Sequence, residues 1–332
     1  MNTNTSPNPS PKFRRIGAGF CGTVWASDTD PASAYKREDG GPERSLRNDS
    51  LMHQRLQRCL QTTRVQIPAH HDFITPVNDD NDNNDGFWTT NLARFPEGYK
   101  PCNMIHAQRI PAIQEDTRKL LIDRYCPPEL AGEIMHSDTN RDCLVRPYLG
   151  RRRIMRPSRT RFKAFSLRNY PLHVDQMEEM GVGREDLLAY SRAMAEVLAV
   201  MHWVGGVDGN DVEFVLAAPN PNEQINKDSG PARSWSNVLG EHEMWVLDFD
   251  LVRDISMDED GVRQAVNAFL KNDPFCPRPD QKCELWGAFR EQYLETGKEC
   301  VVLNDSGAES IDAEEREALP ELFIRLVEED TL

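Results

Sequence analysis

Long apolar runs are missing from this chain of 332 residues. No stretch approaches the roughly 18 apolar residues that a helix needs to cross a membrane. The polar opening MNTNTSPNPSPKF has no apolar run of signal-peptide length. These absences exclude a membrane-embedded protein and predict a folded protein in the cytoplasm with no membrane partner.

Closely spaced cysteines are missing as well. The eight cysteines contain no Cys-x-x-Cys pair, and no two of them stand closer than seven residues. Structural zinc sites and disulfide frameworks normally use tighter or paired spacings. We therefore expect reduced thiols and no metal site.

Basic residues are scarce in relation to acidic ones. The chain has 39 Lys and Arg against 54 Asp and Glu, a net charge of −15. Such a charge disfavours a protein that coats nucleic acid indiscriminately, so DNA is not expected as a partner.

One basic stretch stands out against this background. Residues 151–168, RRRIMRPSRTRFKAFSLR, contain seven Arg and one Lys with no acidic residue, and Phe162 and Phe165 lie among them. The stretch is typical of a surface that binds a specific phosphate-bearing partner. It is equally compatible with a solvated basic loop that pairs with the acidic C-terminal helix.

Composition also divides the chain into parts. Residues 1–12 are predicted to be disordered. The length favours roughly two lobes, and the segment at 108–111 is the expected exit from a lobe at 13–110 to one at 111–332. Residues at about 217–240 are rich in Pro, Asn, Asp, Ser and Gly, which predicts an exposed insertion between two strands of one hairpin.

The first lobe begins with a glycine-rich pattern. Residues 15–25, RIGAGFCGTVW, predict a strand, a glycine turn and a second strand, and Lys36 ends a third strand. A helix is expected over 48–60, with Asn48 or Asp49 as its N-cap. This helix contains no Glu that could pair with Lys36. Asp49 is its nearest candidate, and we expect it to be badly placed for pairing.

An acidic loop follows a predicted buried helix at 187–203. The segment 201–216, MHWVGGVDGNDVEFVL, places Asp208, Asp211 and Glu213 within six residues, and Asp248 follows the next apolar strand. Clustered carboxylates attract a cation such as a guanidinium or an ammonium group. The alternative is that Asp208 and Asp211 cap turns and that Glu213 is a solvated residue at a strand start.

The order of these motifs resembles that of a protein kinase: glycine loop, Lys36, helix, acidic loop, then Asp248. The resemblance implies an α+β, protein-kinase-like two-lobed fold with a small β-rich N-lobe and a larger, mainly helical C-lobe. His202 stands at the helix end, Glu213 replaces the metal-binding Asn, and Asp250 replaces the glycine after Asp-Phe. Helices are also expected at 261–270, at 285–294 and at 309–327, the last interrupted at Pro320.

Further motifs occur at 148–153 (YLGRRR), 165–172 (FSLRNYPL), 211–216 (DVEFVL), 247–250 (LDFD) and 272–275 (NDPF). Together they resemble a fungal family of unknown function with a "zinc finger protein-like" label, over about 13–295. That family includes the arginine-containing cyclodipeptide synthases, which join arginine from arginyl-tRNA to a second aminoacyl group as a diketopiperazine. The resemblance implies this activity, with arginyl-tRNA and a second aminoacyl-tRNA as partners and with no cofactor.

The residues expected to serve this activity fall into three groups. The predicted catalytic residues are Asp208, Asp211, Glu213 and Asp248, and the predicted substrate-binding residues are Lys36, Asp250 and His202. The predicted tRNA-binding residues are Arg151, Arg152, Arg153, Arg156, Arg159, Arg161, Lys163 and Arg168.

Two alternatives remain open from the sequence. A small-molecule phosphotransferase would bind ATP and Mg²⁺ through Lys36, Glu213 and Asp248, and a catalytically silent kinase-like module would only bind a ligand. Ser166 and Cys21 are candidate carriers of an acyl intermediate.

Overall fold

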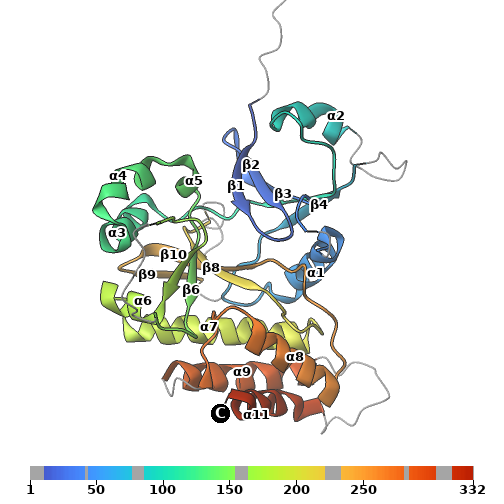
Figure 1. Ribbon diagram of the computed structural model, residues 1–332. Helices are drawn as coiled ribbons and strands as arrows, with labels where there is room; N and C mark the ends of the chain where they lie inside the picture. The colour runs from blue at the N-terminus through green and yellow to red at the C-terminus, as the bar shows by residue number, and fades with distance from the viewer. Residues whose placement is uncertain are drawn as a thin grey trace, which may run out of the picture.

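The structure, a computed structural model, describes residues 11–41, 44–76, 86–153, 164–220, 233–279, 284–303 and 316–331. Within these ranges the chain is a mixed α+β protein, which confirms the predicted class. Two five-stranded sheets lie one above the other, and most of the long helices pack below the second sheet (Figure 1). No helix in the described ranges is both long enough and apolar enough to cross a membrane.

The first sheet is antiparallel and has the strand order β1-β2-β3-β5-β4. Its first hairpin contains the glycine pattern, and the Gly19 amide donates to the Gly22 carbonyl at 2.9 Å. A side chain on Gly22 would lie 1.8 Å from the Arg37 carbonyl oxygen, so only glycine fits there. The strands are β1 (Arg14–Ala18), β2 (Thr23–Ser27), β3 (Asp30–Arg37), β4 (His70–Ile74) and β5 (Met104–Gln108).

Helix α1 (Leu46–Cys59) packs against this sheet, and it begins earlier than its apolar pattern indicates. The N-cap is Ser45, whose hydroxyl accepts a hydrogen bond from the Asn48 amide at 3.3 Å. The expected N-cap at Asn48 or Asp49 is therefore wrong, because a serine three positions earlier satisfies the free amides. As a result Asp49 lies one turn inside the helix, where it is buried.

The second sheet has the order β7-β6-β8-β10-β9. Strands β8 and β10 are antiparallel, and their register pairs Glu213 with Leu247. Asp248 therefore leaves the sheet beside Glu213. The strands are β6 (Val145–Tyr148), β7 (Tyr170–His173), β8 (Glu213–Ala217), β9 (Ser234–Asn237) and β10 (Gly240–Leu247).

The predicted exposed insertion at about 217–240 is wrong at both of its ends. At the first end, Ala217 is the last residue of β8 and is buried, as is Asn220. At the second end, Trp235 and Leu239 are buried, and Trp235 lies edge-to-face on Tyr190 with ring centroids 5.4 Å apart. Residues 234–237 form an edge strand, since burying the tryptophan outweighs the turn-forming composition around it. The remainder of the predicted insertion, 221–232, lies outside the described residues.

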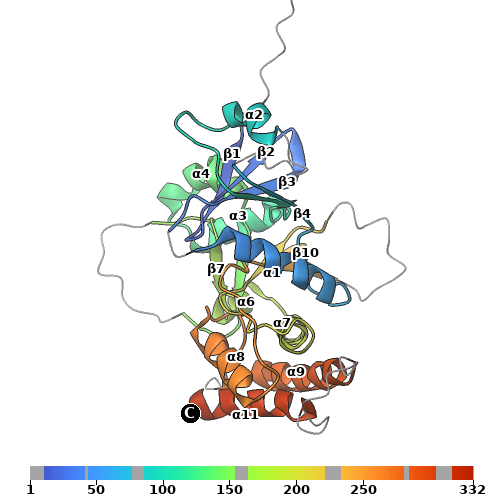
Figure 2. The ribbon, with the colours of Figure 1, turned by 90° about the vertical axis from the view of Figure 1, so that its right-hand side faces the viewer.

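The helices below the second sheet form the largest part of the core. Helices α7 and α9 lie side by side, with α8 and α11 next to them (Figure 2). Residues 316 and 317 are helical, Ala318 forms a turn and α11 begins at Leu319, so the helical stretch is interrupted beside Pro320 as expected. Pro320 itself lies in the first turn of α11, where a missing amide is tolerated. The helices not yet given are α2 (Phe87–Asn91), η1 (Leu92–Arg94), α3 (Glu115–Tyr125), α4 (Pro128–His136), α5 (Asp138–Arg141), α6 (Val174–Met180), α7 (Arg184–Trp203), α8 (Glu259–Lys271), α9 (Glu284–Leu303) and α11 (Leu319–Thr331).

The N-terminal tail was expected to be disordered over 1–12. Its last two residues are anchored, because Lys12 donates to the Ala93 carbonyl at 2.6 Å and Arg94 donates to the Pro11 carbonyl at 2.8 Å. The disorder prediction is therefore wrong for these two residues, and residues 1–10 lie outside the described ranges.

Candidate active site

A pocket lies where the two sheets meet, and both contribute to its walls. The glycine hairpin, Lys36 and Asp49 line one side, and Glu213 and Asp248 line the other. Three of the predicted site residues, Lys36, Glu213 and Asp248, thus share one pocket, although 212 residues separate the first from the last.

Lys36 is the centre of the charge arrangement in this pocket. Its ammonium nitrogen lies 2.5 Å from Oδ2 of Asp49 and 2.7 Å from Oδ1 of Asp248. Burial opposes the charged form, but these two carboxylates nevertheless raise the pKa of Lys36 well above its usual value. The expectation that Asp49 is badly placed is wrong, because the earlier helix start turns it toward Lys36.

Asp49 also fixes the chain at Asp248. Its second oxygen accepts a hydrogen bond from the Phe249 amide at 3.1 Å. Asp248 has a positive φ of 67°, a conformation that costs energy for a residue with a side chain. Burial disfavours the Asp248 carboxylate, yet Lys36 keeps its pKa below the usual value.

Glu213 opens strand β8 at the wall of the pocket. Arg146 Nη2 donates to both of its carboxylate oxygens, each at 2.5 Å. Burial raises the pKa of Glu213 to about 7, Arg146 opposes the rise, and Asp248 adds to it. A carboxyl group with such a pKa can accept a proton at neutral pH and release it again.

Asp208 was predicted to be catalytic, but it does not line the pocket. Its carboxylate is buried and accepts hydrogen bonds from the Asn210 amide at 3.1 Å, the Arg253 amide at 3.0 Å and the Gln264 side chain at 2.9 Å. It therefore joins the loop to the segment after β10 and to α8. For this residue the turn-capping interpretation is the right one.

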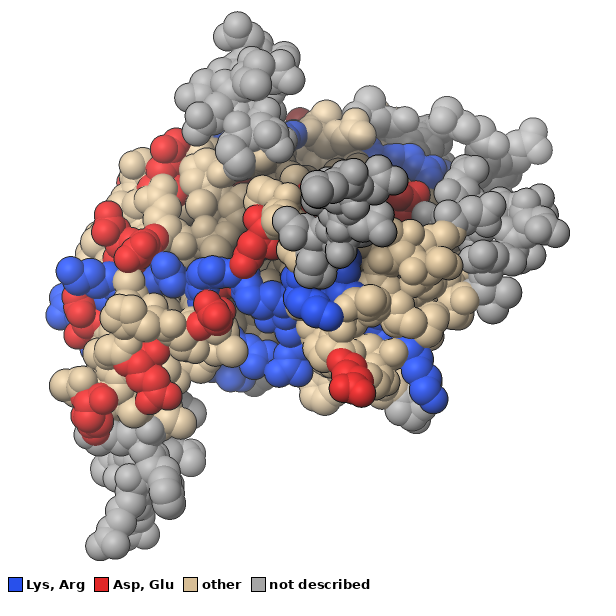
Figure 3. Space-filling view, turned by 90° about the horizontal axis from the view of Figure 1, so that it is seen from above, with Lys and Arg blue, Asp and Glu red and all other residues tan. Residues whose placement is uncertain are grey.

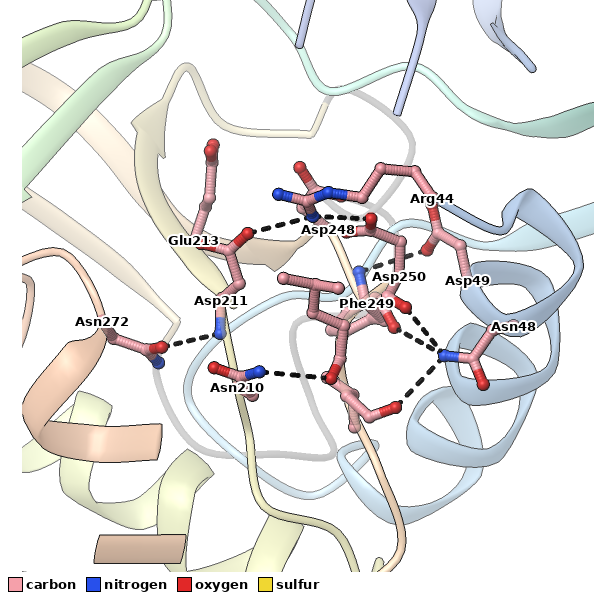
Figure 4. A network of polar contacts seen from close by, with 12 residues as sticks. Arg44, Asn48, Asp49, Asn210, Asp211, Glu213, Asp248, Phe249, Asp250 and Asn272 are labelled. Carbon is pink, nitrogen blue, oxygen red and sulfur yellow. Dashed lines mark hydrogen bonds and ion pairs between the residues drawn. The ribbon is translucent and has the colours of Figure 1, made fainter. Parts of the chain in front are cut away.

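Asp211 and Asp250 lie together, beside the pocket rather than in its lining. Both accept a hydrogen bond from Arg44, a residue that the sequence patterns did not single out. Figure 4 shows the Arg44 side chain reaching over Asp248 to these two carboxylates. No local signal marks Arg44, because its partners stand 167 and 206 residues away in the chain.

His202 was predicted to bind substrate, and this prediction is wrong. The ring is fully buried among the helices, where Nδ1 lies 2.7 Å from the Tyr293 hydroxyl and the ring packs against Phe323. Burial lowers the pKa of His202 to about 3. It is a neutral core residue away from the pocket.

The basic stretch is partly neutralised within the chain. Arg152 pairs with Glu178, and Arg153 pairs with Asp175 and Glu179, so helix α6 and not the C-terminal helix supplies the acids. Arg151 and Arg168 are exposed. Arg156, Arg159, Arg161 and Lys163 lie outside the described residues.

Basic side chains nevertheless gather on one face of the molecule. Seen from above the first sheet, Lys and Arg form a band across the surface, with acidic side chains scattered on both sides (Figure 3). A band of this kind attracts polyanions locally despite the net charge of −15.

Neither candidate acyl carrier has the surroundings of a nucleophile. Ser166 donates to the Asn140 side chain at 3.2 Å and accepts from the Arg168 amide, so it stabilises a turn. Burial raises the pKa of the Cys21 thiol to about 12, which leaves it protonated at neutral pH. Ser166 is therefore a structural residue, whereas Cys21 lines the pocket as a protonated thiol.

Comparison with known families gives one match. A domain family of unknown function described as "Zinc finger protein" matches residues 244–305, from β10 to the end of α9. This match supports the predicted resemblance to the family with that label over this segment. No curated protein matches the chain.

The residues of the matched segment do not fit a zinc finger. The segment contains three cysteines and no histidine, fewer than the four Cys or His ligands of a structural zinc site. In the part of the chain that the structure describes, no three His, Cys, Asp or Glu side chains converge as a metal site.

Proposed function

We infer that this chain is an arginine-containing cyclodipeptide synthase with a protein-kinase-like two-lobed fold, a small lobe at 13–110 and a large lobe at 111–332. It takes arginine from arginyl-tRNA and a second aminoacyl group from another tRNA, in the cytoplasm. The family match over 244–305 supports this proposal, together with the chemistry of the pocket.

The kinase-like part of the proposal rests on the charge arrangement around Lys36. A lysine on the third strand pairs with an acid of the following helix and with the Asp of an Asp-Phe segment, under a glycine hairpin. Protein kinases use the same order of parts. Here Asp49 takes the place of the helix glutamate.

The observation that carries the activity is the state of Glu213. Peptide-bond formation needs a base that takes a proton from an α-ammonium or α-amine group near neutral pH. Burial places the pKa of Glu213 at about 7, in the pocket that also contains Lys36 and Asp248.

The proposed reaction has two acyl transfers. In the first, the α-amine of one aminoacyl group attacks the ester carbonyl of the other, a C–N bond forms, the ester C–O bond breaks, and one tRNA leaves with its 3′-terminal oxygen protonated. Glu213 accepts the amine proton and returns it to the leaving oxygen. The free α-amine of the dipeptidyl-tRNA then attacks its own ester in the same way, which closes the ring and releases the second tRNA.

Lys36 and the basic residues have separate tasks in this scheme. The Lys36 ammonium stabilises the negative charge that develops on the carbonyl oxygen during each attack. The exposed Arg151 and Arg168, together with Arg156, Arg159, Arg161 and Lys163, bind phosphates of the tRNA.

A small-molecule phosphotransferase is the second candidate, and the Lys36 ion pairs favour it. It needs a second metal ligand at Glu213, but Arg146 already engages both oxygens of that carboxylate. A metal cation at Glu213 would be repelled by this guanidinium, whereas a proton needs only the second lone pair that each carboxylate oxygen keeps, so the acyl-transfer scheme fits better.

The deciding experiment is expression in a host that makes no diketopiperazines, followed by mass spectrometry of the medium. An arginine-containing cyclic dipeptide is expected with the wild-type chain and not with Glu213→Gln. Purified protein with arginyl-tRNA and a mixture of other aminoacyl-tRNAs should give the same product without ATP. A thermal shift with ATP and Mg²⁺, and no cyclic dipeptide, would instead establish the phosphotransferase.

A further inference from the structure

Arg44 lies in a cradle made of two carboxylates and an aromatic ring. Its Nη1 atom lies 2.6 Å from Oδ2 of Asp250 and 3.2 Å from Oδ2 of Asp211 (Figure 4). On another side, its guanidinium carbon lies 5.6 Å from the ring centroid of Phe20, at the tip of the glycine hairpin. Carboxylates combined with an aromatic face are the groups that recognise a guanidinium ion.

The fit of Arg44 in this cradle is incomplete. Both carboxylates accept from the same nitrogen, so the two-pronged geometry of a guanidinium is not used. Asp250 is only 1% exposed, and its Oδ1 atom has no hydrogen-bond partner among the described residues. A buried carboxylate with one free acceptor can still take a bidentate guanidinium, and a buried acceptor left without a partner is costly.

The cradle is supported independently of Arg44. The Asn48 side chain donates to the carbonyls of Asp250 and Val252 at 2.9 and 3.1 Å. The Asp211 amide donates to the Asn272 side chain at 2.7 Å. Arg44 can therefore leave the cradle while the two carboxylates stay in position, as a preformed binding site requires.

The accessible side of the cradle is formed by Phe20 and Asp211. Phe20 is 81% exposed, and 47% of the Asp211 side chain is exposed. Asp211 and Asp250 each stand two residues from a pocket carboxylate, Glu213 and Asp248 respectively. A ligand whose cationic end enters the cradle thus has its other end at the pocket.

We propose that Asp211, Asp250 and Phe20 form a guanidinium-binding subsite and that Arg44 is its internal occupant, which a ligand guanidinium displaces. That the subsite accepts a guanidinium group is inferred from Arg44, whose own guanidinium lies in it. The identification of the ligand as the arginyl group of the substrate rests on the proposed function.

The test uses L-argininamide, which carries the guanidinium and an α-amine but no tRNA, with L-citrullinamide as its uncharged counterpart. Binding is measured by titration calorimetry on the whole chain. Arg44→Met keeps an unbranched apolar stem and removes the competing guanidinium. Argininamide is therefore expected to bind about tenfold tighter than to wild type, the factor for an occupant present about 90% of the time. Citrullinamide should bind none of the variants.

Two further variants make the result specific. Arg47→Met removes an exposed arginine three residues away that lies over Phe73, and it should bind argininamide as wild type does. Asp250→Asn in the Arg44→Met background should abolish the tighter binding. Melting temperatures are measured for each variant. If Arg44→Met does not fold, the guanidinium NMR signal of Arg44 is followed in the wild-type chain instead. That signal should change as argininamide saturates the site.

The proposal is overturned if Arg44→Met binds argininamide no tighter than Arg47→Met, or if Asp250→Asn leaves the binding unchanged. An unchanged Arg44 NMR signal at saturation would overturn it equally. Failure of the proposed function is separate, because it appears as a chain that binds argininamide as described and makes no cyclic dipeptide. A chain that makes the cyclic dipeptide while Arg44→Met binds no tighter retains the function and loses only this subsite.

Discussion

Asp208 and Glu213 are acids five residues apart in one loop, yet they lie in different surroundings. Asp208 is buried and accepts three hydrogen bonds from amide groups of the chain. Glu213 faces the pocket, where only one arginine, Arg146, stabilises its charged form. Burial outweighs this effect and raises the pKa of Glu213 to about 7. The comparison shows that the number of carboxylates in a loop does not measure reactivity, because the partners of each carboxylate decide whether it is structural or reactive.

The largest expected effect concerns the reactive member of the pair. Glu213→Gln keeps the size of the side chain and removes the base, so kcat for cyclic dipeptide formation should fall by about 10²-fold or more. Activity of the wild-type enzyme should rise with pH through about 7, because the ionised carboxylate is the base, and the variant should lack this rise. Both are measured by single-turnover kinetics with arginyl-tRNA, and wild-type rates in the variant would remove Glu213 from the mechanism.

Asp208→Ala tests the structural member. Two backbone amides and one side-chain amide lose their buried acceptor, which should lower the free energy of unfolding by about 3 kcal/mol. The measurement is urea denaturation followed by circular dichroism. At a temperature where the variant is folded, its activity per folded molecule should stay within a few-fold of wild type. A stable but inactive Asp208→Ala would show that Asp208 takes part in the reaction.

The pH dependence of stability sharpens the same contrast. The pKa of Glu213 rises from its usual 4.5 to about 7 on folding, so the folded state binds more protons than the unfolded state between these values. The wild type should lose stability as pH rises from about 4.5 to about 7, by about 3 kcal/mol relative to Glu213→Gln. Parallel unfolding curves at several pH values check this, and an identical slope in both proteins would show that Glu213 has an ordinary pKa.

The smallest expected effect concerns the basic stretch, where some arginines are paired with acids of the chain and others are exposed without such a pairing among the described contacts. Arg151→Ala should reduce the log–log salt slope of tRNA binding by about one unit, because an exposed arginine is available to a phosphate. Arg153→Ala removes a side chain already paired with Asp175 and Glu179, so it should change the slope little and cost less than about 1 kcal/mol of stability. Filter binding at several salt concentrations tests both predictions. Equal slopes for the two variants would show that pairing within the chain does not affect how an arginine contributes to tRNA binding.

Local patterns in the sequence were sufficient for much of the fold. The glycine spacing predicted the first hairpin, and the apolar spacing at 187–203 predicted most of α7 (Arg184–Trp203). These predictions succeed because turn geometry and helical periodicity depend on residues a few positions apart. The acidic loop was selected for its density of carboxylates, and Asp248 for the resemblance of its segment to that of protein kinases.

What only the tertiary structure decided is which charges meet. The sequence determined that acids gather near Glu213. The ion pairs of Lys36 with Asp49 and Asp248, and of Arg44 with Asp250, depend on how α1 packs against the first sheet and contacts the segment after β10. Burial then gave two candidate site residues different properties. It made His202 a neutral core residue, and it raised the pKa of Glu213 to about 7. Pairing and desolvation are properties of groups brought together across the whole chain, so no local pattern contains them.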